Sequence, residues 1–207
     1  MPHIDSYRTW SRQVHGQTYT ISTDPRLIQY DALDAAFRSD MLYWAQPLSP
    51  ELMQRCVEQS LCFALYVVDN DGRIKGEQND VHGNTETKGT ETLQDPESKI
   101  QMVGFARLIT DHVTFGYLTD VYVLSEHQGR GLGRWMMQCL NEVVSEWPML
   151  RRCILFTRGE TAARMYRKTI GMMEWDGQKA GLIFMERPGP GKRIPQGDGT
   201  EKEDKSV

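Results

Sequence analysis

A glycine-rich turn between a predicted strand and a predicted helix carries the clearest chemical signal in this 207-residue sequence. The turn consists of Gln128, Gly129, Arg130, Gly131, Leu132, Gly133 and Arg134. The start of a helix leaves backbone N–H groups unpaired and carries partial positive charge, and glycines let the backbone approach an anion closely. We therefore predict that main-chain amides of residues 128–133 bind a phosphate or pyrophosphate, and that Arg130 and Arg134 add positive charge.

The spacing of this turn differs from two common phosphate-binding motifs. A P-loop requires Gly-Lys-Ser/Thr, whereas Gly133 is followed by Arg134. The dinucleotide-binding pattern G-x-G-x-x-G would need a glycine at a position that holds Arg134 or Met136. The pattern that fits is Gln-x-x-Gly-x-Gly, at Gln128, Gly131 and Gly133. A turn that only caps the following helix is the alternative interpretation.

Hydrophobic spacing predicts the elements that position the turn. Strands are expected at residues 19–22, 61–68, 102–110, 114–124, 153–156, 172–175 and 182–186. Helices are expected at residues 24–37, 49–57, 131–146 and 161–170, the first two opened by Asp-Pro and Ser-Pro start signals. This order predicts an α/β (mixed α+β) fold, with a central mixed sheet of six to seven strands and helices on both faces.

Composition and charge limit the classes of protein and partner. The net charge of −4 and the pI of about 5.8 argue against a nucleic-acid partner. The mean hydropathy of −0.54, and the lack of any apolar run near the roughly 20 residues that cross a bilayer, argue against a membrane partner. The length fits one domain of ordinary size, with 39% hydrophobic residues to form its core.

Three polar stretches with few core-forming residues divide the chain. We predict an irregular N-terminal extension at residues 1–16 and one domain at 17–186, with a flexible insertion at 70–98. Residues 187–207 are predicted to form a disordered C-terminal tail. The four cysteines form no Cys-x-x-Cys pair, so we expect reduced thiols, no metal site and a cytoplasmic protein, with access to the nucleus left open.

The Gln-x-x-Gly-x-Gly turn resembles that of the GNAT superfamily of acyl-CoA-dependent N-acetyltransferases. A second segment is similar to the family's A-x-x-x-Y-x-K-x-G-F helix: Thr157 ends a predicted strand, and Ala162, Tyr166 and Gly171 follow. The sequence departs from this pattern where Met172 replaces the usual phenylalanine. The stretches at 104–111 and 117–121, and Ser39 with Tyr43, Trp44 and Ala45, resemble a largely uncharacterised branch of the family that is common in bacteria.

The resemblance implies a fold, a co-substrate and site residues. The sheet would split between its fourth and fifth strands, and acetyl-CoA would bind there with its pyrophosphate on the turn. The resemblance places Val121, Tyr122 and Val123 beside the pantetheine and the thioester, and gives Thr157, Ala162 and Tyr166 contacts with the co-substrate. It also implies that Tyr166 acts as the general acid that protonates the leaving thiolate.

The general base is an open question at the level of sequence. An ammonium acceptor must lose a proton before it attacks the thioester. Asp120 lies on the strand just before the co-substrate stretch and could accept that proton directly or through water. Asp120 could equally bind the ammonium or form a structural ion pair. Tyr117 and Asp111 are weaker alternatives for the base.

We expect the acceptor pocket to come from the first two helices and their connection. Phe37, Tyr43 and Trp44 could form a slot for a small-molecule amine with an apolar part, or they could simply pack in the core. Tyr117 is a further candidate for acceptor binding, and Arg107 could bind the carboxylate of an amino-acid-like acceptor or form a surface ion pair. A protein acceptor and a non-catalytic acyl-CoA sensor are the competing functions. Exposed strand edges would permit a homodimer.

Overall fold

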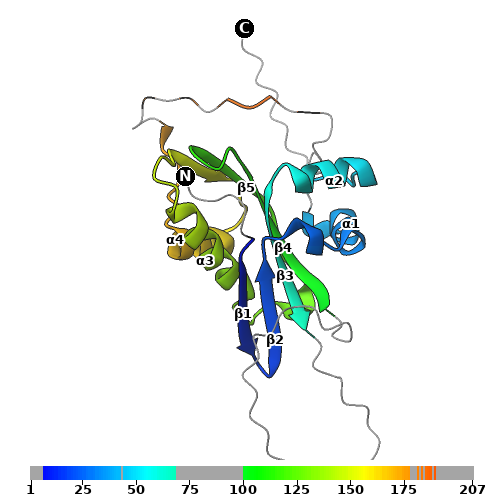
Figure 1. Ribbon diagram of the computed structural model, residues 1–207. Helices are drawn as coiled ribbons and strands as arrows, with labels where there is room; N and C mark the ends of the chain where they lie inside the picture. The colour runs from blue at the N-terminus through cyan, green and yellow to red at the C-terminus, as the bar shows by residue number, and fades with distance from the viewer. Residues whose placement is uncertain are drawn as a thin grey trace, which may run out of the picture.

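A six-stranded mixed sheet, with its strands in chain order, runs through the protein (Figure 1). The computed structural model describes residues 7–42, 44–68, 100–177, 181, 183, 185–187 and 189. The strands are β1 (Thr9–Val14), β2 (Gln17–Ser22), β3 (Leu61–Val68), β4 (Ile100–Thr110), β5 (Phe115–Val123) and β6 (Arg152–Leu155). Neighbouring strands are antiparallel except β5 and β6, which are parallel. The predicted α/β class with a mixed sheet is therefore confirmed.

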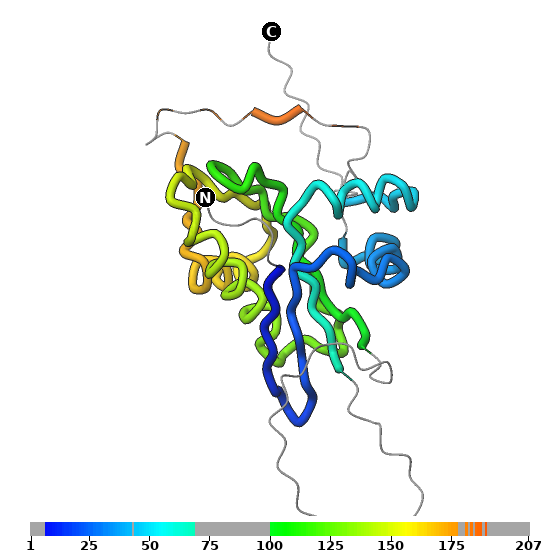
Figure 2. Tube along the Cα trace, viewed as in Figure 1, coloured from blue at the N-terminus to red at the C-terminus, as the bar shows by residue number. Residues whose placement is uncertain are grey.

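Two pairs of helices cover the two faces of the sheet, as Figures 1 and 2 show. On one face lie α1 (Tyr30–Arg38) and α2 (Pro50–Glu58), and on the other lie α3 (Leu132–Ser145) and α4 (Glu160–Ile170). Each pair buries its apolar side against the sheet, so the protein has a hydrophobic cluster on each face.

The predicted start of the first helix is wrong by several residues. Asp24 does accept a hydrogen bond from the Arg26 amide, but it opens only a short 3-10 helix, η1 (Pro25–Leu27). Ile28 then takes an extended backbone with ψ 123°, which interrupts the helical path, and α1 begins two residues later. The Ser-Pro signal for the second helix is confirmed, since the Ser49 hydroxyl accepts a hydrogen bond from the Leu52 amide at the start of α2.

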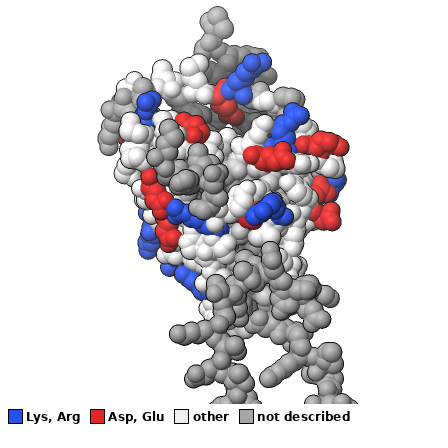
Figure 3. Space-filling model, in the orientation of Figure 1, with Lys and Arg blue, Asp and Glu red and all other residues white. Residues whose placement is uncertain are grey.

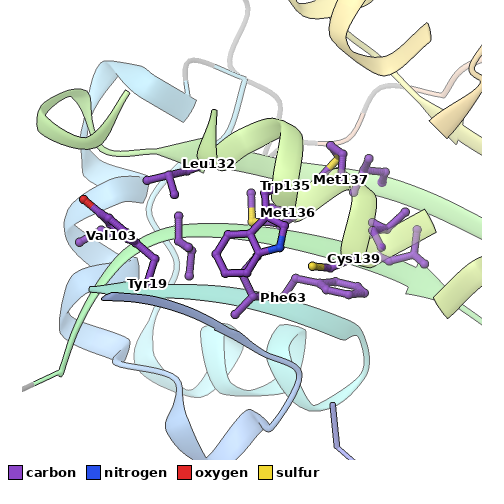
Figure 4. Packing of buried hydrophobic residues seen from close by; sticks show 14 of the residues in the cluster. Tyr19, Phe63, Val103, Leu132, Trp135, Met136, Met137 and Cys139 are labelled. Carbon is purple, nitrogen blue, oxygen red and sulfur yellow. The ribbon is translucent and has the colours of Figure 1, made fainter. Parts of the chain in front are cut away.

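The core between α3 and the sheet is closely packed (Figure 4). Met136 and Leu140 of α3 are fully buried, and they lie in one cluster with Phe63 and Val103 of the sheet, which are also fully buried. Because α3 begins at the glycine-rich turn, this packing fixes the position of the turn relative to β5. The helix therefore connects the stability of the core to the geometry of the candidate phosphate site.

The sheet splits where β5 and β6 part. Their parallel pairing joins only residues 115–118 of β5 to residues 152–155 of β6. Within the described residues, β5 continues from Thr119 to Val123 with no strand paired on that side. These two strands are the fourth and fifth of the sequence prediction, which did not include β1, so the predicted split is confirmed.

Two other sequence expectations are wrong. Residues 1–16 are not all irregular, because Thr9–Val14 form β1, an edge strand whose Arg12 guanidinium lies 4.8 Å from the centre of the Trp135 ring. The segment 172–175 forms no strand, and neither do the described residues of 182–186; Met173 and Ile183 each leave 89% of their surface exposed. The insertion predicted at 70–98 and almost all of the predicted tail lie outside the described residues.

Basic and acidic side chains alternate on the face of the protein shown in Figure 3, where the described residues form no broad area of one sign. In the described part of the chain, no helix has the length and apolar character needed to cross a membrane. The same residues include no group of three or more histidine, cysteine or acidic side chains arranged to hold a metal ion.

Replacement of a core residue of α3 should destabilise the protein far more than replacement of its exposed neighbour. Met136→Ala leaves a cavity at a fully buried site, and we expect it to lower the free energy of unfolding by about 3 kcal/mol. Gln138→Ala, at an exposed position of the same helix, should change it by less than about 0.5 kcal/mol. Urea denaturation of both variants measures the difference, and equal losses would contradict this account of the core.

Candidate active site

A cleft of about 780 Å³ opens at the split between β5 and β6. Its walls come from β5, from the segment after β6, from α4 and from the connection after α1. Residues that line it include Trp44, Tyr117, Asp120, Val121, Thr157, Ala162 and Tyr166. The fold therefore gathers in one cavity seven residues that the sequence marked as candidates from four separate segments.

A β-bulge shapes the floor of this cleft. In the register of β4 and β5, Phe105 lies opposite Tyr122 and Arg107 lies opposite Thr119, so Asp120 and Val121 together face the single residue between Phe105 and Arg107. Asp120 has φ 53°, in the left-handed region that a residue with a side chain rarely adopts. Such a bulge bends its strand and disrupts the regular ladder of hydrogen bonds, which makes the backbone at Asp120 and Val121 available for other contacts.

A buried ion pair holds the bulge. The Arg107 guanidinium donates from Nε to Asp120 Oδ2 at 2.7 Å, and the two side chains are only 15% and 3% exposed. The second carboxylate oxygen accepts hydrogen bonds from Trp44 Nε1 at 3.4 Å and from the Thr119 hydroxyl at 3.2 Å. Both oxygens of Asp120 are therefore engaged by the protein itself, which favours the structural ion pair among the roles that the sequence left open.

This pairing also changes the interpretation of Arg107. The sequence offered it as a ligand for the carboxylate of an acceptor, or as one half of a surface ion pair. The structure places its guanidinium largely inside the protein, on the carboxylate of the chain's own Asp120. An acceptor carboxylate would have to compete with that internal contact.

The glycine-rich turn presents an open surface of backbone. Gly129 and Gly131 have φ of +74° and +76°, and apart from their immediate surroundings in the chain no described atom lies within 4 Å of the position where a Cβ would stand on either residue. Gly131 is the N-cap of α3 and has no side chain to satisfy the amides of the first helical turn. These amides and the open space fit a pyrophosphate, which is the group that this end of a helix accommodates.

The polar side chains of the turn bind the protein rather than the open surface. Arg130 donates from Nη1 to Gln17 Oε1 at 2.6 Å and to the Tyr19 hydroxyl at 2.7 Å, both on β2. Gln128 donates from Nε2 to the Val123 carbonyl at 2.8 Å. These contacts hold the turn against β2 and the end of β5. Arg134, at the start of α3, is exposed. Of the two arginines, Arg134 is thus the one whose charge is on the protein surface.

His127 belongs to the same supporting contacts. Its Nδ1 lies 2.9 Å from the Tyr19 hydroxyl, which Arg130 also contacts. Burial and the neighbouring Arg130 charge lower the pKa of His127, so its imidazole is largely neutral at physiological pH. The ring therefore adds little charge to the turn, and its role is to support it.

Tyr166 of α4 brings a neutral phenol to the cleft. Its side chain is buried except for about 8% of its surface, and it lines the cavity together with Thr157 and Ala162. Burial raises the pKa of Tyr166 to about 12. The phenol therefore keeps its proton at physiological pH and can donate it to a developing anion.

The other predicted site residues are placed differently. Phe37 is 5% exposed and packs in the cluster under α1 and α2, and it is not among the residues that line the cleft. Tyr43 lies outside the described residues. Tyr122 is 7% exposed and packs on Phe105, and Leu132 is in the core below the turn. Gly133 lies between Val123 and Met165, both just under 4 Å from a built Cβ.

Asp111, the weaker alternative for a base, caps the turn between β4 and β5. Its carboxylate accepts hydrogen bonds from the amides of Val113, Thr114 and Phe115 and from the Thr114 hydroxyl. These bonds lower the pKa of Asp111 well below its usual range, so the group does not act as a base near neutral pH.

Sequence reasoning missed several residues that line the cleft. Phe156 follows β6 and leaves 65% of its surface exposed, and Arg158 and Glu186 also contribute to the walls. For Phe156 a signal existed, because it stands at the carboxyl end of a strand next to the split, where binding residues of α/β proteins gather. Glu186 gave no such signal.

Comparison with known proteins identifies relatives of the chain. A family model for the acetyltransferase (GNAT) domain matches residues 96–169. A Gibberella zeae protein named as a candidate acetyltransferase is 42% identical over 194 residues, which cover 92% of this chain and 98% of that protein. The crystal structure of a candidate acetyltransferase of the GNAT family from Xanthomonas campestris is 29% identical, with a TM-score of 0.54, and covers 84% of this chain and 94% of the other.

A more distant structure shows the same fold. A Staphylococcus aureus protein of 16% identity aligns with a TM-score of 0.50 over 81% of this chain and 99% of its own length. The overall fold is thus shared with solved structures.

Removal of one partner from the buried ion pair should destabilise the protein strongly. Arg107→Ala leaves the Asp120 carboxylate buried without its guanidinium, and we expect the free energy of unfolding to fall by about 3 kcal/mol. The exposed pair of Arg38 and Asp34 on α1 provides the matched control, since Arg38→Ala should cost less than about 0.5 kcal/mol. Chemical denaturation at neutral pH compares the two, and a loss in Arg107→Ala no larger than that of the control would refute the structural role.

Proposed function

This chain belongs to the GNAT family of acetyltransferases, and from that premise we propose that it transfers an acetyl group from acetyl-CoA to a primary amine of a small molecule. One observation carries the proposal. Residues 119–123 of β5 are paired with β4 on one side and, on the other side, extend beyond the end of β6. The open turn at 128–133 follows one end of this stretch, and the cleft lies at its other end. A ligand with a pyrophosphate at one end and a reactive group at the other can therefore bind along a single strand.

The residues of this chain divide the binding between backbone and side chains. The amides of the turn and of the first turn of α3 would hold the pyrophosphate, with Arg134 at the surface nearby. The backbone of Val121, Tyr122 and Val123 would run beside the pantetheine, at the edge that β6 leaves unpaired. When bound, acetyl-CoA supplies a thioester, whose carbonyl carbon is the site that the amine attacks. Backbone N–H groups near the bulge are suited to stabilise the charge that develops on the carbonyl oxygen.

Tyr166 is our candidate for the general acid. Its buried phenol is neutral at physiological pH and lines the same cleft as Thr157 and Ala162, so it can give a proton to the departing sulfur. Asp120 is assigned a positioning role, because its oxygens already accept hydrogen bonds from Arg107, Trp44 and Thr119. The amine would then lose its proton to water before the attack, and alignment of the two reactants supplies much of the acceleration.

Two other functions would use the same turn. They differ from the proposed one in the acceptor or in the absence of turnover. A protein acetyltransferase would acetylate a lysine side chain or an N-terminus, and a sensor would bind acyl-CoA without turnover. We favour a small amine because the cleft, of about 780 Å³ between two strands, must admit the thioester as well as the acceptor, which leaves limited room for a protein segment. Release of free CoA thiol, measured with a panel of small amines and with lysine peptides, distinguishes the three.

A charge placed on the turn should weaken binding of the co-substrate. Asp and Asn have the same shape, both tolerate a positive φ and both cap helices, so Gly131→Asp and Gly131→Asn differ mainly in charge. We expect the Asp variant to bind CoA about tenfold more weakly than the Asn variant at low salt, and the difference to shrink as salt increases. Isothermal titration calorimetry measures both, and equal affinities would place the pyrophosphate elsewhere.

Loss of the Tyr166 hydroxyl should slow turnover without removing CoA binding. Tyr166→Phe keeps the ring in its buried position, and we expect kcat to fall about 100-fold while the Kd for CoA changes less than about threefold. Because the pKa of Tyr166 is raised to about 12, the wild-type rate should rise with pH as the amine deprotonates and should show no descending limb near pH 10. A descending limb there, or full activity of the variant, would exclude Tyr166 as the acid.

A further inference from the structure

We propose that the acceptor is an aromatic alkylamine, meaning a primary amine joined by a short chain to a flat apolar ring, with no second charged group. This inference rests on the proposed acetyl transfer and names its substrate class. It comes from the side of the cleft that faces away from the turn, where aromatic side chains line it and where the buried carboxylate of its described lining, Asp120, is paired with Arg107.

Three aromatic side chains from three different parts of the chain line the cleft. Trp44 comes from the connection after α1, Tyr117 from β5, and Phe156 from the segment after β6. The rings of Tyr117 and Phe156 lie 5.9 Å apart and nearly perpendicular, at 73°, the edge-to-face geometry that aromatic pairs prefer. Phe156 still leaves 65% of its surface exposed. A ring bound against these side chains would bury that apolar surface and extend the same edge-to-face packing.

We call Trp44, Tyr117 and Phe156 the aromatic wall. The orientation of Trp44 in this wall is fixed before any acceptor binds. Trp44 Nε1 donates a hydrogen bond to Asp120 Oδ1, and the same carboxylate is bound by Arg107. The indole orientation is thus tied to the bulge on β5, which lies at the point where the thioester is expected. A ring packed on Trp44 would have its position fixed relative to that point, and a short chain would bring its amine to the thioester.

The charges of the cleft disfavour acceptors with a second charge. Among the described residues that line it, the charged ones are Asp120, Arg158 and Glu186. Asp120 is buried and paired with Arg107, so it supplies no net charge to an ammonium or a carboxylate. Arg158 and Glu186 are exposed and of opposite sign, and screening by solvent makes their attraction for a ligand weak. An amino acid, a polyamine or a lysine peptide would bring charge into a cavity that offers no buried partner for it.

The reaction on such an acceptor balances without any further reactant. The lone pair of the neutral amine forms a bond to the carbonyl carbon of the thioester, and the bond from that carbon to sulfur breaks. The nitrogen loses one proton to water and the sulfur gains one from an acid, so the products are the N-acetylated amine and CoA thiol.

The test compares acceptors that share a primary amine and differ in the rest of the molecule. The panel contains 2-phenylethylamine, n-hexylamine, phenylalanine, spermidine and a short lysine peptide, with thiol release as the readout. We expect kcat/KM for 2-phenylethylamine to exceed that of each other compound by about tenfold or more. Calorimetry of 2-phenylethylamine against n-hexylamine, without acetyl-CoA, gives a readout that does not depend on turnover, and the ring compound should bind more tightly.

Variants of the aromatic wall test whether its side chains contact the acceptor. Phe156→Ala removes an exposed ring at little cost to folding, and we expect it to raise KM for 2-phenylethylamine about fivefold with the Kd for CoA unchanged. Trp44→Phe keeps a ring but loses the hydrogen bond to Asp120, and it should also raise KM for the ring compound. Phe115→Ala is the control, because Phe115 is 39% exposed on β5 and is not among the residues that line the cleft.

The outcomes separate this inference from the proposed function. Faster acetylation of hexylamine, phenylalanine, spermidine or the peptide would overturn the aromatic acceptor and leave acetyl transfer in place. Binding of CoA with no thiol release from any compound would overturn both. Equal effects of Phe156→Ala and Phe115→Ala would show that the cleft wall does not contact the acceptor, and this too would overturn the inference.

Discussion

The geometry of the cleft depends on one buried ion pair, that of Arg107 with Asp120. The bulge on β5 places Asp120 at a positive φ, which aspartate tolerates better than most residues but which still costs more than an extended backbone, so contacts elsewhere must offset that cost. The guanidinium on β4 and the indole of Trp44 supply those contacts, and they join two strands to the connection after α1. The pairing of β5 with β6 ends at Leu118, two residues before the bulge. The curvature of β5, the opening of the cleft and the orientation of Trp44 in its lining therefore all depend on the Asp120 carboxylate.

The glycine-rich turn and the cleft, the two halves of the candidate site, present different groups to a ligand. At the turn, the surface available to a ligand is formed by backbone. The side chains of Arg130 and Gln128 hold the turn against β2 and the end of β5. At the cleft, the ligand side is made of side chains. Backbone amides can bind any pyrophosphate, whereas side chains such as those of Trp44 and Phe156 would discriminate between ligands by shape and polarity. In the proposed function, selectivity for the acceptor therefore resides in the cleft.

The turn could be predicted from sequence because its requirements are local. Glycines at 129 and 131 meet positive φ values, and α3 follows directly, so residue type and order suffice. The partner of Arg107 could not be predicted, because Arg107 lies opposite Thr119 in the strand register and its contact with Asp120 depends on the extra residue in β5. The strand at Thr9–Val14 was missed since it is a polar edge strand, although His15 and Gly16, both with positive φ, form the kind of turn that joins two antiparallel strands. Apolar content alone suggested a strand at 172–175, but Met173 and Trp175 face solvent.

The engagement of Asp120 bears on how the acceptor amine becomes neutral. Both oxygens of that carboxylate already accept hydrogen bonds from side chains of the protein, namely those of Arg107, Trp44 and Thr119. The part of the cleft next to the bulge would also disfavour an ammonium to the extent that it removes the amine from water, because burial destabilises the charged form of an amine. With the one buried carboxylate of its described lining neutralised by Arg107, the cleft offers little to stabilise a cation. In the proposed reaction, selection of the neutral amine by desolvation and its alignment against the thioester would require no dedicated base.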